Sequence, residues 1–265
     1  MMGAVIGDVA GSQYEFGGEK TKLFPLFTRD SHPTDDSIMT VAVGCACVDA
    51  DLDDEASFKH EVIKRMKELG RLYPYAGYGG MFYRWIMSDV SKPYYSYGNG
   101  SAMRVSPVGW AADSLEEAER LAKWSAEVTH NHPEGIKGAQ AVAAAIYLAR
   151  TGKSKEEIEK YISDNYYSLD FTLDEIRPDY AFDVTCQGSV PQAIKCFLEA
   201  VDFEDAVRNA ISLGGDADTQ ACIAGSIAEA YFGIDDELCE EVMEYIDEDL
   251  SDYFDHYMEE LYGKI

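Results

Sequence analysis

Basic residues are scarce in this sequence. Only 22 Lys and Arg residues stand against 49 Asp and Glu residues, which gives the 265-residue chain a formal net charge of −27 at pH 7. A field of this sign repels nucleic-acid phosphates, so we expect no nucleic-acid partner. If the substrate is anionic, the protein must create a local positive centre, and a bound cation is the most direct one.

Long apolar runs are also missing. Runs such as residues 41–48 and 141–149 are much shorter than the roughly 20 residues that a membrane-spanning helix requires. Residues 1–8 contain no basic leader and reach an acid at once, so we expect no signal peptide. These absences predict a soluble protein with no membrane partner.

Paired cysteine spacings are absent as well. No CxxC motif occurs among the six cysteines, and most of them lie in apolar segments of helical character. Buried free thiols in a reducing cytoplasm explain this distribution better than zinc binding or disulfides, so we predict a cytoplasmic protein. The six are Cys45, Cys47, Cys186, Cys196, Cys222 and Cys239.

The two-residue alternation of a half-buried strand is not found, and neither is an internal repeat or a low-complexity linker. Nearly half of the residues are hydrophobic, so the chain can bury a sizeable core. We predict one all-α domain, residues 1–265, with roughly ten helices. The expected helices are residues 1–12, 34–48, 56–69, 81–87, 114–128, 154–162, 190–200, 203–213, 218–232 and 236–261, with an alanine-rich helix that ends at Arg150.

Some of these helices have recognisable starts. Ser114 and Ser154 each precede a glutamate by three residues, which is the pattern of a capping box. Pro191 is tolerable if it lies in the first turn of its helix, where a proline costs no hydrogen bond. The last segment alternates acids with apolar residues and predicts an amphipathic, acidic outer helix or pair of helices.

Glycines recur at four-residue spacing in the first expected helix, at Gly3, Gly7 and Gly11. On a helix, residues at this spacing share one face. Because glycine has no side chain, that face forms a smooth stripe that another helix can approach closely. We therefore predict a tightly packed core helix at the start of the chain.

Two short stretches place a threonine beside two carboxylates where a loop turns into a helix. The first, residues 34–36, has the pattern of an N-cap with acids in the first turn, so capping explains it as well as metal binding does. The second, residues 216–219, could face the first across one site. Their polar residues are Thr34, Asp35, Asp36, Asp216, Asp218 and Thr219.

These side chains offer only oxygen ligands, which selects Mg²⁺, Mn²⁺ or Ca²⁺ rather than zinc or copper. Four carboxylates in one site repel one another unless cations neutralise them. Two metals about 3.5–4 Å apart are a standard way to use such a set, and they can orient a ribose and activate water. Gly214 and Gly215 precede the second stretch and would let backbone come close to a ligand, while the helix start favours an anion.

Two loops rich in glycine and tyrosine, residues 73–80 and 94–101, are candidates for ligand contacts. Such loops add little to a core but supply backbone and stacking rings, and we favour this interpretation over ordinary surface turns. Arg104 follows them and can serve an anionic ligand or pair with one of the many acids. His130 and His132 lack a third nitrogen or sulfur ligand, so we interpret them as hydrogen-bonding residues, with His132 a candidate for the pocket wall.

Together these motifs resemble a known family. Five stretches, residues 3–11, 34–37, 97–104, 129–133 and 214–219, match the ADP-ribosylglycohydrolases, the group that contains dinitrogenase-reductase-activating glycohydrolase. The stretches occur in the family's order and span nearly the whole chain. Any one of them is a weak signal, whereas five in order are a strong one.

The resemblance implies a compact orthogonal multi-helix bundle with a dinuclear centre of two Mg²⁺, or Mn²⁺. It also implies hydrolysis of the N- or O-glycosidic bond between ADP-ribose and an acceptor, such as an arginine or serine side chain of an ADP-ribosylated protein. By motif match, the metal ligands would be Thr34, Asp35, Asp36, Asp216, Asp218 and Thr219.

The resemblance further assigns roles around the metals. Asp35, Asp36 or Glu15 could act as general base, and Glu15 matches a loop glutamate that approaches the metals as a mobile flap in some members. Carboxylates near the ribose would also stabilise an oxocarbenium-like transition state. The residues expected to contact substrate are Asn99, Gly100, Ser101, His132 and Gly215.

Three other functions are compatible with these residues. The protein could bind ADP-ribose without cleaving it, although every matched metal position carries an oxygen ligand. It could hydrolyse a small ADP-ribosyl or ribosyl metabolite instead of a modified protein. A purely structural Ca²⁺ site is the third alternative, and it would leave the glycine-rich loops without a role.

Overall fold

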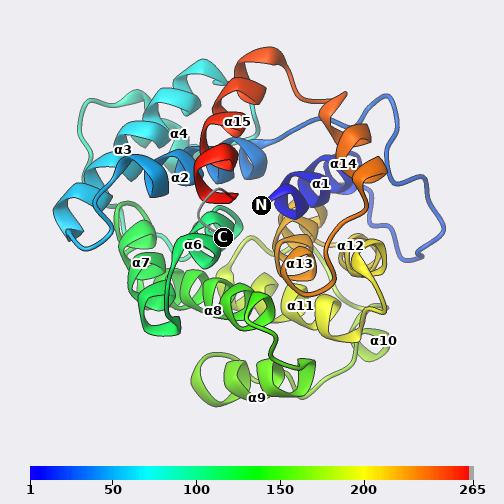
Figure 1. Ribbon diagram of the computed structural model, residues 1–265. Coiled ribbons are helices and arrows are strands. Elements are labelled where there is room, and N and C mark those ends of the chain that lie inside the picture. The colour runs from blue at the N-terminus through cyan, green and yellow to red at the C-terminus, as the bar shows by residue number, and fades with distance from the viewer. Residues whose placement is uncertain (263–265) are drawn as a thin grey trace.

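The computed structural model of the protein describes residues 1–262, which form helices joined by loops (Figure 1). No β-strand occurs in this range, where Gly98 and Thr185 form an isolated bridge, and the all-α prediction is confirmed. The elements are α1 (Met2–Gly11), η1 (Ser12–Tyr14, a 3-10 helix), α2 (Asp35–Asp49), α3 (Glu55–Leu72), α4 (Gly80–Met87), α5 (Gly100–Met103), α6 (Ser106–Ala111), α7 (Leu115–Glu127), α8 (Pro133–Arg150), α9 (Lys155–Asn165), α10 (Leu173–Ile176), α11 (Cys186–Glu199), α12 (Phe203–Ile211), α13 (Ala217–Phe232), α14 (Asp236–Met243) and α15 (Glu248–Tyr262).

Residues 1–262 contain fifteen α-helices, more than the roughly ten expected. Three of the additional helices, α5, α6 and α10, are only four to six residues long. Helices of this length are too short to show a hydrophobic period in the sequence. The acidic segment near the end of the chain also divides into two helices, α14 and α15.

The helix caps behave largely as the sequence predicts. Thr34 is the N-cap of α2 and accepts a hydrogen bond from the Asp36 backbone N–H. Ser154 forms a complete capping box with Glu157 at the start of α9. Ser114 caps α7, but the Glu117 carboxylate accepts from the backbone N–H one residue earlier, at position 113, so the predicted box is only half formed.

The prediction that Pro191 lies in a first helical turn is wrong. Helix α11 begins at Cys186, where the Thr185 side chain caps it, so Pro191 lies inside the helix. The Thr185 cap is specified by a loop that also pairs with the chain near Gly98, and this tertiary contact cannot be read from the local sequence.

The glycine stripe of α1 packs against α13, as predicted. A Cβ atom on Gly7 would lie 2.1 Å from the Ala221 carbonyl oxygen, and one on Gly11 would lie 2.5 Å from the Asp218 Cα. Such distances are impossible for any residue with a side chain, so glycine permits the two backbones to touch. Figure 1 shows this pair in the middle of the molecule. The contact fixes the first residues of α13 beside α1.

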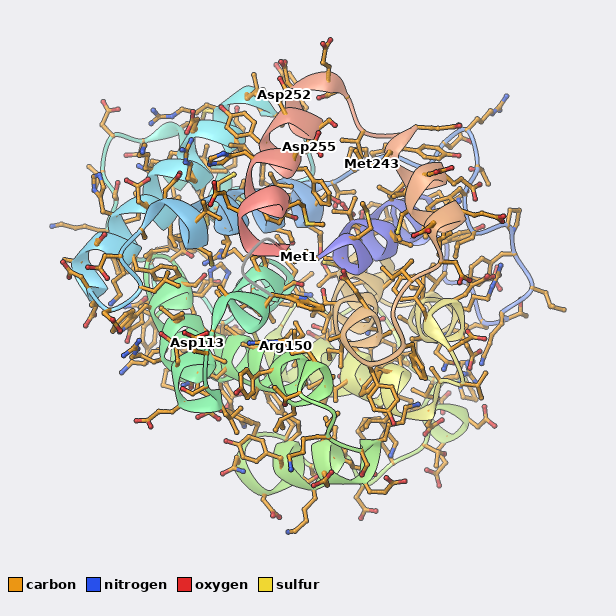
Figure 2. The ribbon with its side chains drawn as sticks, viewed as in Figure 1. Met1, Asp113, Arg150, Met243, Asp252 and Asp255 are labelled. Carbon is orange, nitrogen blue, oxygen red and sulfur yellow. The ribbon has the colours of Figure 1, made fainter. Side chains whose placement is uncertain are left out.

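Helix α15 covers one side of the core. Its buried residues include Phe254 and Tyr257, and the Tyr257 ring packs where Gly44 of α2 has no side chain. Asp252 and Asp255 are exposed on the same helix (Figure 2). The amphipathic acidic outer helix is therefore confirmed for this part of the chain.

The cysteines of residues 1–262 are all free, and five of the six are buried. This agrees with the prediction of free thiols, with Cys239 only half-buried. A search of the same residues finds no helix with the length and apolar character that crossing a membrane requires.

Candidate active site

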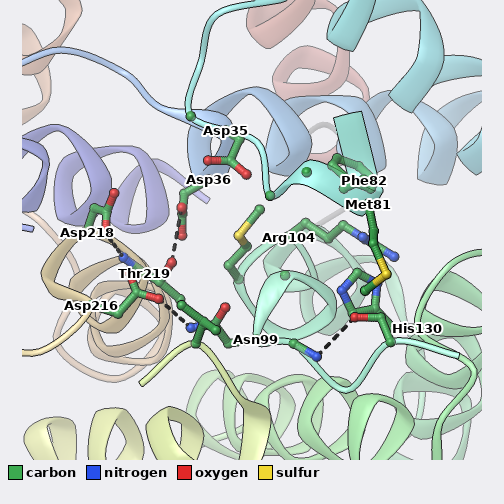
Figure 3. Close-up of a pocket in the computed structure, with 18 of the residues that line it drawn as sticks. Asp35, Asp36, Met81, Phe82, Asn99, Arg104, His130, Asp216, Asp218 and Thr219 are labelled. Carbon is green, nitrogen blue, oxygen red and sulfur yellow. Dashed lines mark hydrogen bonds between the residues drawn. The ribbon is translucent and has the colours of Figure 1, made fainter. Parts of the chain in front are cut away.

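Carboxylates from three helices meet at one place. Helix α1 contributes Asp8. The start of α2 contributes Asp36, and the start of α13 contributes Asp216 and Asp218 (Figure 3). All four are buried, and Glu15 joins them from the end of η1. The α1–α13 contact therefore places acids that are far apart in the sequence within one cluster.

The cluster has no internal counter-charge. No Lys or Arg within residues 1–262 forms an ion pair with any of its members. Burial, followed by repulsion from neighbouring aspartates, raises the pKa values of Asp36 and Asp218 well above the ordinary range. Like charges held this close out of water are unfavourable unless protons or cations neutralise them.

The donor set fits a hard divalent cation. One carboxylate oxygen each from Asp8, Asp36 and Asp218 lie within 4.8 Å of one another, and so do oxygens from Glu15, Asp216 and Asp218. Asp218 belongs to both groups, which places two possible ion positions side by side. The Oδ1 atom of Asp36 is buried and has no hydrogen-bond donor within residues 1–262. Such an orphaned oxygen is the ligand that Mg²⁺ or Mn²⁺ would bind.

Asp8 has a different role from the other acids, and it lies outside the two threonine–carboxylate stretches that the sequence shows. Its carboxylate accepts hydrogen bonds from the Thr34 backbone N–H at 2.8 Å, the Thr34 hydroxyl at 2.6 Å and the Ser37 backbone N–H at 3.0 Å, as well as from the Ser37 hydroxyl. These bonds tie the start of α2 to α1. The sequence feature that could have identified Asp8 is its position as an acid within an apolar helix that carries the glycine stripe.

A cavity of about 570 Å³ opens beside the cluster. The loop that leads into α5 forms one of its walls, and Asn99 joins this loop to the acids. The Asn99 side chain donates to Asp216 at 2.7 Å and to Ser189 at 3.1 Å, and its backbone N–H donates to the Val184 carbonyl at 2.8 Å. Backbone around Gly98 and Gly100 faces the cavity, as the glycine-rich loop predicts.

Arg104 and His130 lie across the cavity from the acids (Figure 3). Arg104 is fully buried and, within residues 1–262, has neither an ion pair nor a hydrogen bond from its Nε atom. Its Nη2 atom donates to the Ser125 carbonyl and to the Thr129 hydroxyl, both at 3.0 Å. Burial lowers the Arg104 pKa to about 10, so the side chain remains a cation at neutral pH.

A hydrogen-bond chain from Arg104 sets the tautomer of His130. Arg104 donates to the Thr129 hydroxyl oxygen. We therefore assign the Thr129 O–H as the donor to the His130 Nδ1 atom, 2.7 Å away, which accepts. Burial and the Arg104 charge lower the His130 pKa well below its usual value, so the ring is neutral with its proton on Nε2. That nitrogen lies next to Gly100, where a Cβ atom would be 3.3 Å away. His130 thus presents a donor to the glycine-rich wall.

The family follows from comparison of the whole chain. A model of the ADP-ribosylglycohydrolase family matches residues 1–265. The chain belongs to the ADP-ribosylglycohydrolase family. It is therefore an enzyme of the glycohydrolase class, which hydrolyses glycosidic bonds, and its acidic cluster is the part of the fold that could hold a metal ion.

Individual relatives agree with this assignment. The ADP-ribosylglycohydrolase chain is similar to ADP-ribosylhydrolase ARH3 of Homo sapiens, with 27% identity over 318 residues that cover 89% of this chain and 85% of ARH3. It is also similar to ADP-ribosylarginine hydrolase Tri1 of Pseudomonas putida, with 30% identity over 144 residues that cover 52% of this chain and 39% of Tri1. A solved ADP-ribosylglycohydrolase-related protein complex has the same fold, with a TM-score of 0.67, 22% identity and 92% coverage of both chains.

Most of the site residues predicted for this glycohydrolase come together in the structure. Thr34 does not line the cavity, but its hydroxyl oxygen lies 3.4 Å from the Asp36 carboxylate. Thr219 donates to the same carboxylate at 3.2 Å. The predicted residues that line the cavity are Glu15, Asp35, Asp36, Asn99, Gly100, Asp216, Asp218 and Thr219.

Three residues predicted to contact substrate lie outside the lining. The Ser101 hydroxyl points toward α8 and donates to the Gly135 carbonyl at 2.7 Å. Gly215 packs against protein, because a Cβ atom there would lie 2.4 Å from the Tyr180 ring. His132 is the N-cap of α8, and its Nδ1 atom accepts from the Glu134 backbone N–H at 3.0 Å.

The histidine that lines the cavity is His130. A sequence signal for this distinction existed. Pro133 begins α8, and a proline in the first helical position makes the preceding residue the N-cap. The side chain of His132 is therefore engaged by the helix, where it also packs against Tyr95 and Tyr97.

Proposed function

We propose that the protein is a Mg²⁺-dependent ADP-ribosylhydrolase, which cleaves the glycosidic bond between ADP-ribose and an acceptor. The observation that supports this most directly is the charge layout of one cavity. Among the residues that the structure describes, carboxylates without a basic partner and with an orphaned Asp36 oxygen lie at one end, and Arg104 without an acidic partner lies at the other. A ligand with a ribosyl centre and a diphosphate matches both ends.

The proposed metal ligands are the hydroxyl and carboxylate oxygens at the starts of α2 and α13. When bound, two Mg²⁺ ions would orient the ribose hydroxyls and neutralise the cluster. Mn²⁺ satisfies the same oxygen ligands. The set consists of Thr34, Asp35, Asp36, Asp216, Asp218 and Thr219.

The side chains of the acidic end would act on the ribosyl carbon. As the glycosidic bond breaks, positive charge develops on the ribose, and carboxylates fixed nearby stabilise it. The proton of the attacking water needs a carboxylate acceptor in the cavity, and Glu15, Asp35 and Asp36 are the candidates that line it. Glu15 follows η1 and, within residues 1–262, forms no ion pair that would fix its carboxylate.

The opposite end would bind the diphosphate. The His130 Nε2–H group and backbone near Gly98 and Gly100 face the cavity, and the Arg104 charge lies behind them. Donors and a buried cation are the groups that phosphate oxygens require. The cavity of about 570 Å³ is within the range of about 300–1,000 Å³ typical of small-molecule sites.

A linkage-resolved hydrolysis assay tests this proposal. The wild-type protein should release ADP-ribose from peptides ADP-ribosylated on arginine or serine in Mg²⁺, and EDTA should stop the release. Asp36→Asn should lower the rate about 100-fold or more, a loss of about 2.7 kcal/mol in transition-state stabilisation. Asp252→Asn, on the exposed face of α15, is the matched control and should have the wild-type rate.

The proposal fails if the folded, metal-loaded protein releases ADP-ribose from neither linkage. Tight ADP-ribose binding without turnover would identify a binding protein instead. Turnover of small ADP-ribosyl compounds but not of modified peptides would restrict the substrate to a metabolite.

A further inference from the structure

Two phenylalanine rings are exposed at the edge of the cavity. The Phe16 side chain is 84% exposed and the Phe182 side chain is 47% exposed, yet both line the cavity. Their ring centroids lie 5.7 Å apart with an angle of 33° between the ring planes. Exposed aromatic rings that touch each other over a cavity indicate a ligand-contacting surface, because folding gains little from leaving them in water.

The two rings come from different segments that the fold holds together at this edge. Phe16 directly follows Glu15, and Phe182 lies in the loop that pairs with the glycine-rich wall. In that loop the Val184 carbonyl accepts from Asn99, and the Asp183 carboxylate accepts from the Thr185 backbone N–H at 2.8 Å. The ring pair therefore has a defined position beside the acidic end.

An acidic residue adjoins each of the two rings in the chain. Glu15 lines the cavity next to Phe16, and Asp183 adjoins Phe182 in the chain. Lys20 is close in sequence, but its ammonium group donates to the Tyr180 and Leu213 carbonyls. The basic residues that line the cavity are Arg84 and Arg104, and Figure 3 shows Arg104 across from the acids.

Aromatic faces surrounded by carboxylates attract a flat cation. A guanidinium group stacks on an aromatic ring and is attracted by the ring quadrupole, which a neutral hydroxyl is not. Nearby acids add a Coulomb attraction of the same sign. The edge of the cavity therefore discriminates between acceptors by charge and shape.

We propose that Phe16 and Phe182 form an acceptor platform that selects guanidinium-linked over hydroxyl-linked substrates. This inference rests on the proposed function, which places the ribosyl carbon at the acids and lets the acceptor project toward the rings. Hydrolysis transfers the water hydroxyl to that carbon and returns the water proton to the leaving nitrogen. The acceptor is then a cation both before and after cleavage, so the platform contacts it throughout the reaction.

Leucine substitutions remove the rings while retaining an apolar side chain. In Phe16→Leu and Phe182→Leu, we expect kcat/KM for an ADP-ribosyl-arginine peptide to fall about 3- to 30-fold, the equivalent of a cation–π interaction. The matching ADP-ribosyl-serine peptide should lose less, so the ratio of the two kcat/KM values falls. Leu23→Ala changes another exposed apolar residue of the Phe16 loop, 93% exposed and outside the cavity lining, and should keep the wild-type ratio.

Binding of free ADP-ribose shows whether the rings contact the acceptor or the nucleotide. Because the platform contacts the acceptor, the Kd of ADP-ribose measured by calorimetry should change less than about twofold in both leucine variants. A loss of ADP-ribose affinity as large as the loss in kcat/KM would overturn the platform, since the rings would then contact the nucleotide.

The remaining outcomes separate this inference from the proposed function. Equal losses on the arginine- and serine-linked peptides, or no loss on either, would overturn the platform in an enzyme that is otherwise active. Release from neither peptide by the wild-type protein would overturn the proposed function, and the platform with it. Circular dichroism of each variant shows that it is folded.

Discussion

The two ends of the cavity have opposite charge. Among residues 1–262, neither end forms an ion pair with a side chain of opposite charge. The acidic end is built on the starts of α2 and α13 and on α1, where backbone contact between Gly7 and Ala221 fixes the geometry. The opposite end is built from loops around Arg104, which has no acidic partner among residues 1–262 although the chain has a net charge of −27. We therefore propose that a ligand completes each end, a cation at one and an anion at the other.

The acidic end itself contains two kinds of carboxylate. Asp8 accepts four hydrogen bonds and acts as a structural anchor, whereas Asp36 retains an oxygen with no donor. Isosteric Asp→Asn substitutions should separate these roles, and a substitution at Arg104 should separate the two ends.

Asp218→Asn should have the largest effect on activity. Asp218 belongs to both groups of acids, so we expect ADP-ribose release to fall about 100-fold or more. In EDTA the variant should be more stable than the wild type by about 1–2 kcal/mol, because one charge leaves a buried cluster of like charges. Thermal unfolding in EDTA measures the stability gained by removing the charge, and thermal unfolding in Mg²⁺ measures the stabilisation by the metal. Equal stabilisation of wild type and variant by Mg²⁺ would refute the assignment.

Asp8→Asn should lower stability in EDTA, whereas Asp218→Asn should raise it. The amide retains one acceptor oxygen but turns an NH₂ group toward the donors of Thr34 and Ser37. We expect the free energy of unfolding in EDTA to fall by about 2–3 kcal/mol, the range for hydrogen bonds to a charged group. Urea denaturation provides the measurement. A variant as stable as Asp218→Asn would show that Asp8 is another uncompensated acid.

Arg104→Met should weaken the anionic end selectively. The substitution keeps an unbranched apolar side chain and removes the guanidinium charge, so we expect ADP-ribose affinity to fall about 10- to 100-fold, or about 1.4–2.8 kcal/mol. Calorimetry with ADP-ribose provides the measurement, and Mg²⁺ binding should not change. Arg150→Met is the matched control, because Arg150 also lacks an ion pair within residues 1–262 but donates to the Gly109 carbonyl outside the cavity. Equal effects of both substitutions would contradict the charge layout.

His130 should give the smallest effect, a pH dependence of stability. Its pKa is lowered in the folded protein, so in mildly acidic solution the unfolded chain binds a proton that folded His130 does not. The contribution of His130 to the free energy of unfolding is fully present above its unfolded pKa of about 6.5. It decreases as the pH falls, by at most about 1.4 kcal/mol per pH unit. Urea denaturation between pH 7 and pH 5 should show a shallower slope in His130→Gln. His60→Gln, on the exposed side of α3, should keep the wild-type slope.

Local sequence was enough for the helix starts that carry the acids. The N-cap at Thr34 and the cap at Ser154 depend on side chains within three residues, so they appear in the sequence and are confirmed. The acids of α2 and α13 were chosen for the same reason, because helix starts and oxygen ligands are both local patterns.

The features that were missed depend on tertiary contacts. Asp8 is one acid in an apolar helix until α2 is placed against it. The partners of Arg104 come from α7 and the loop after it. The choice between His130 and His132 is an exception, because Pro133 marks the start of α8 in the local sequence. Gly215 was expected beside a ligand, but in the structure its lack of a side chain makes room for the Tyr180 ring. Local patterns predicted the acids better than they predicted the opposite wall.

The contact between α1 and α13 also determines when the enzyme can form. The two helices lie near opposite ends of the sequence, so a chain emerging from the ribosome contains α1 long before α13 is made. Contacts between distant segments form late in folding, because a long loop must close before they are gained. The acidic cluster therefore cannot assemble on a partly synthesised chain, and binding of a cation would report that synthesis has passed α13.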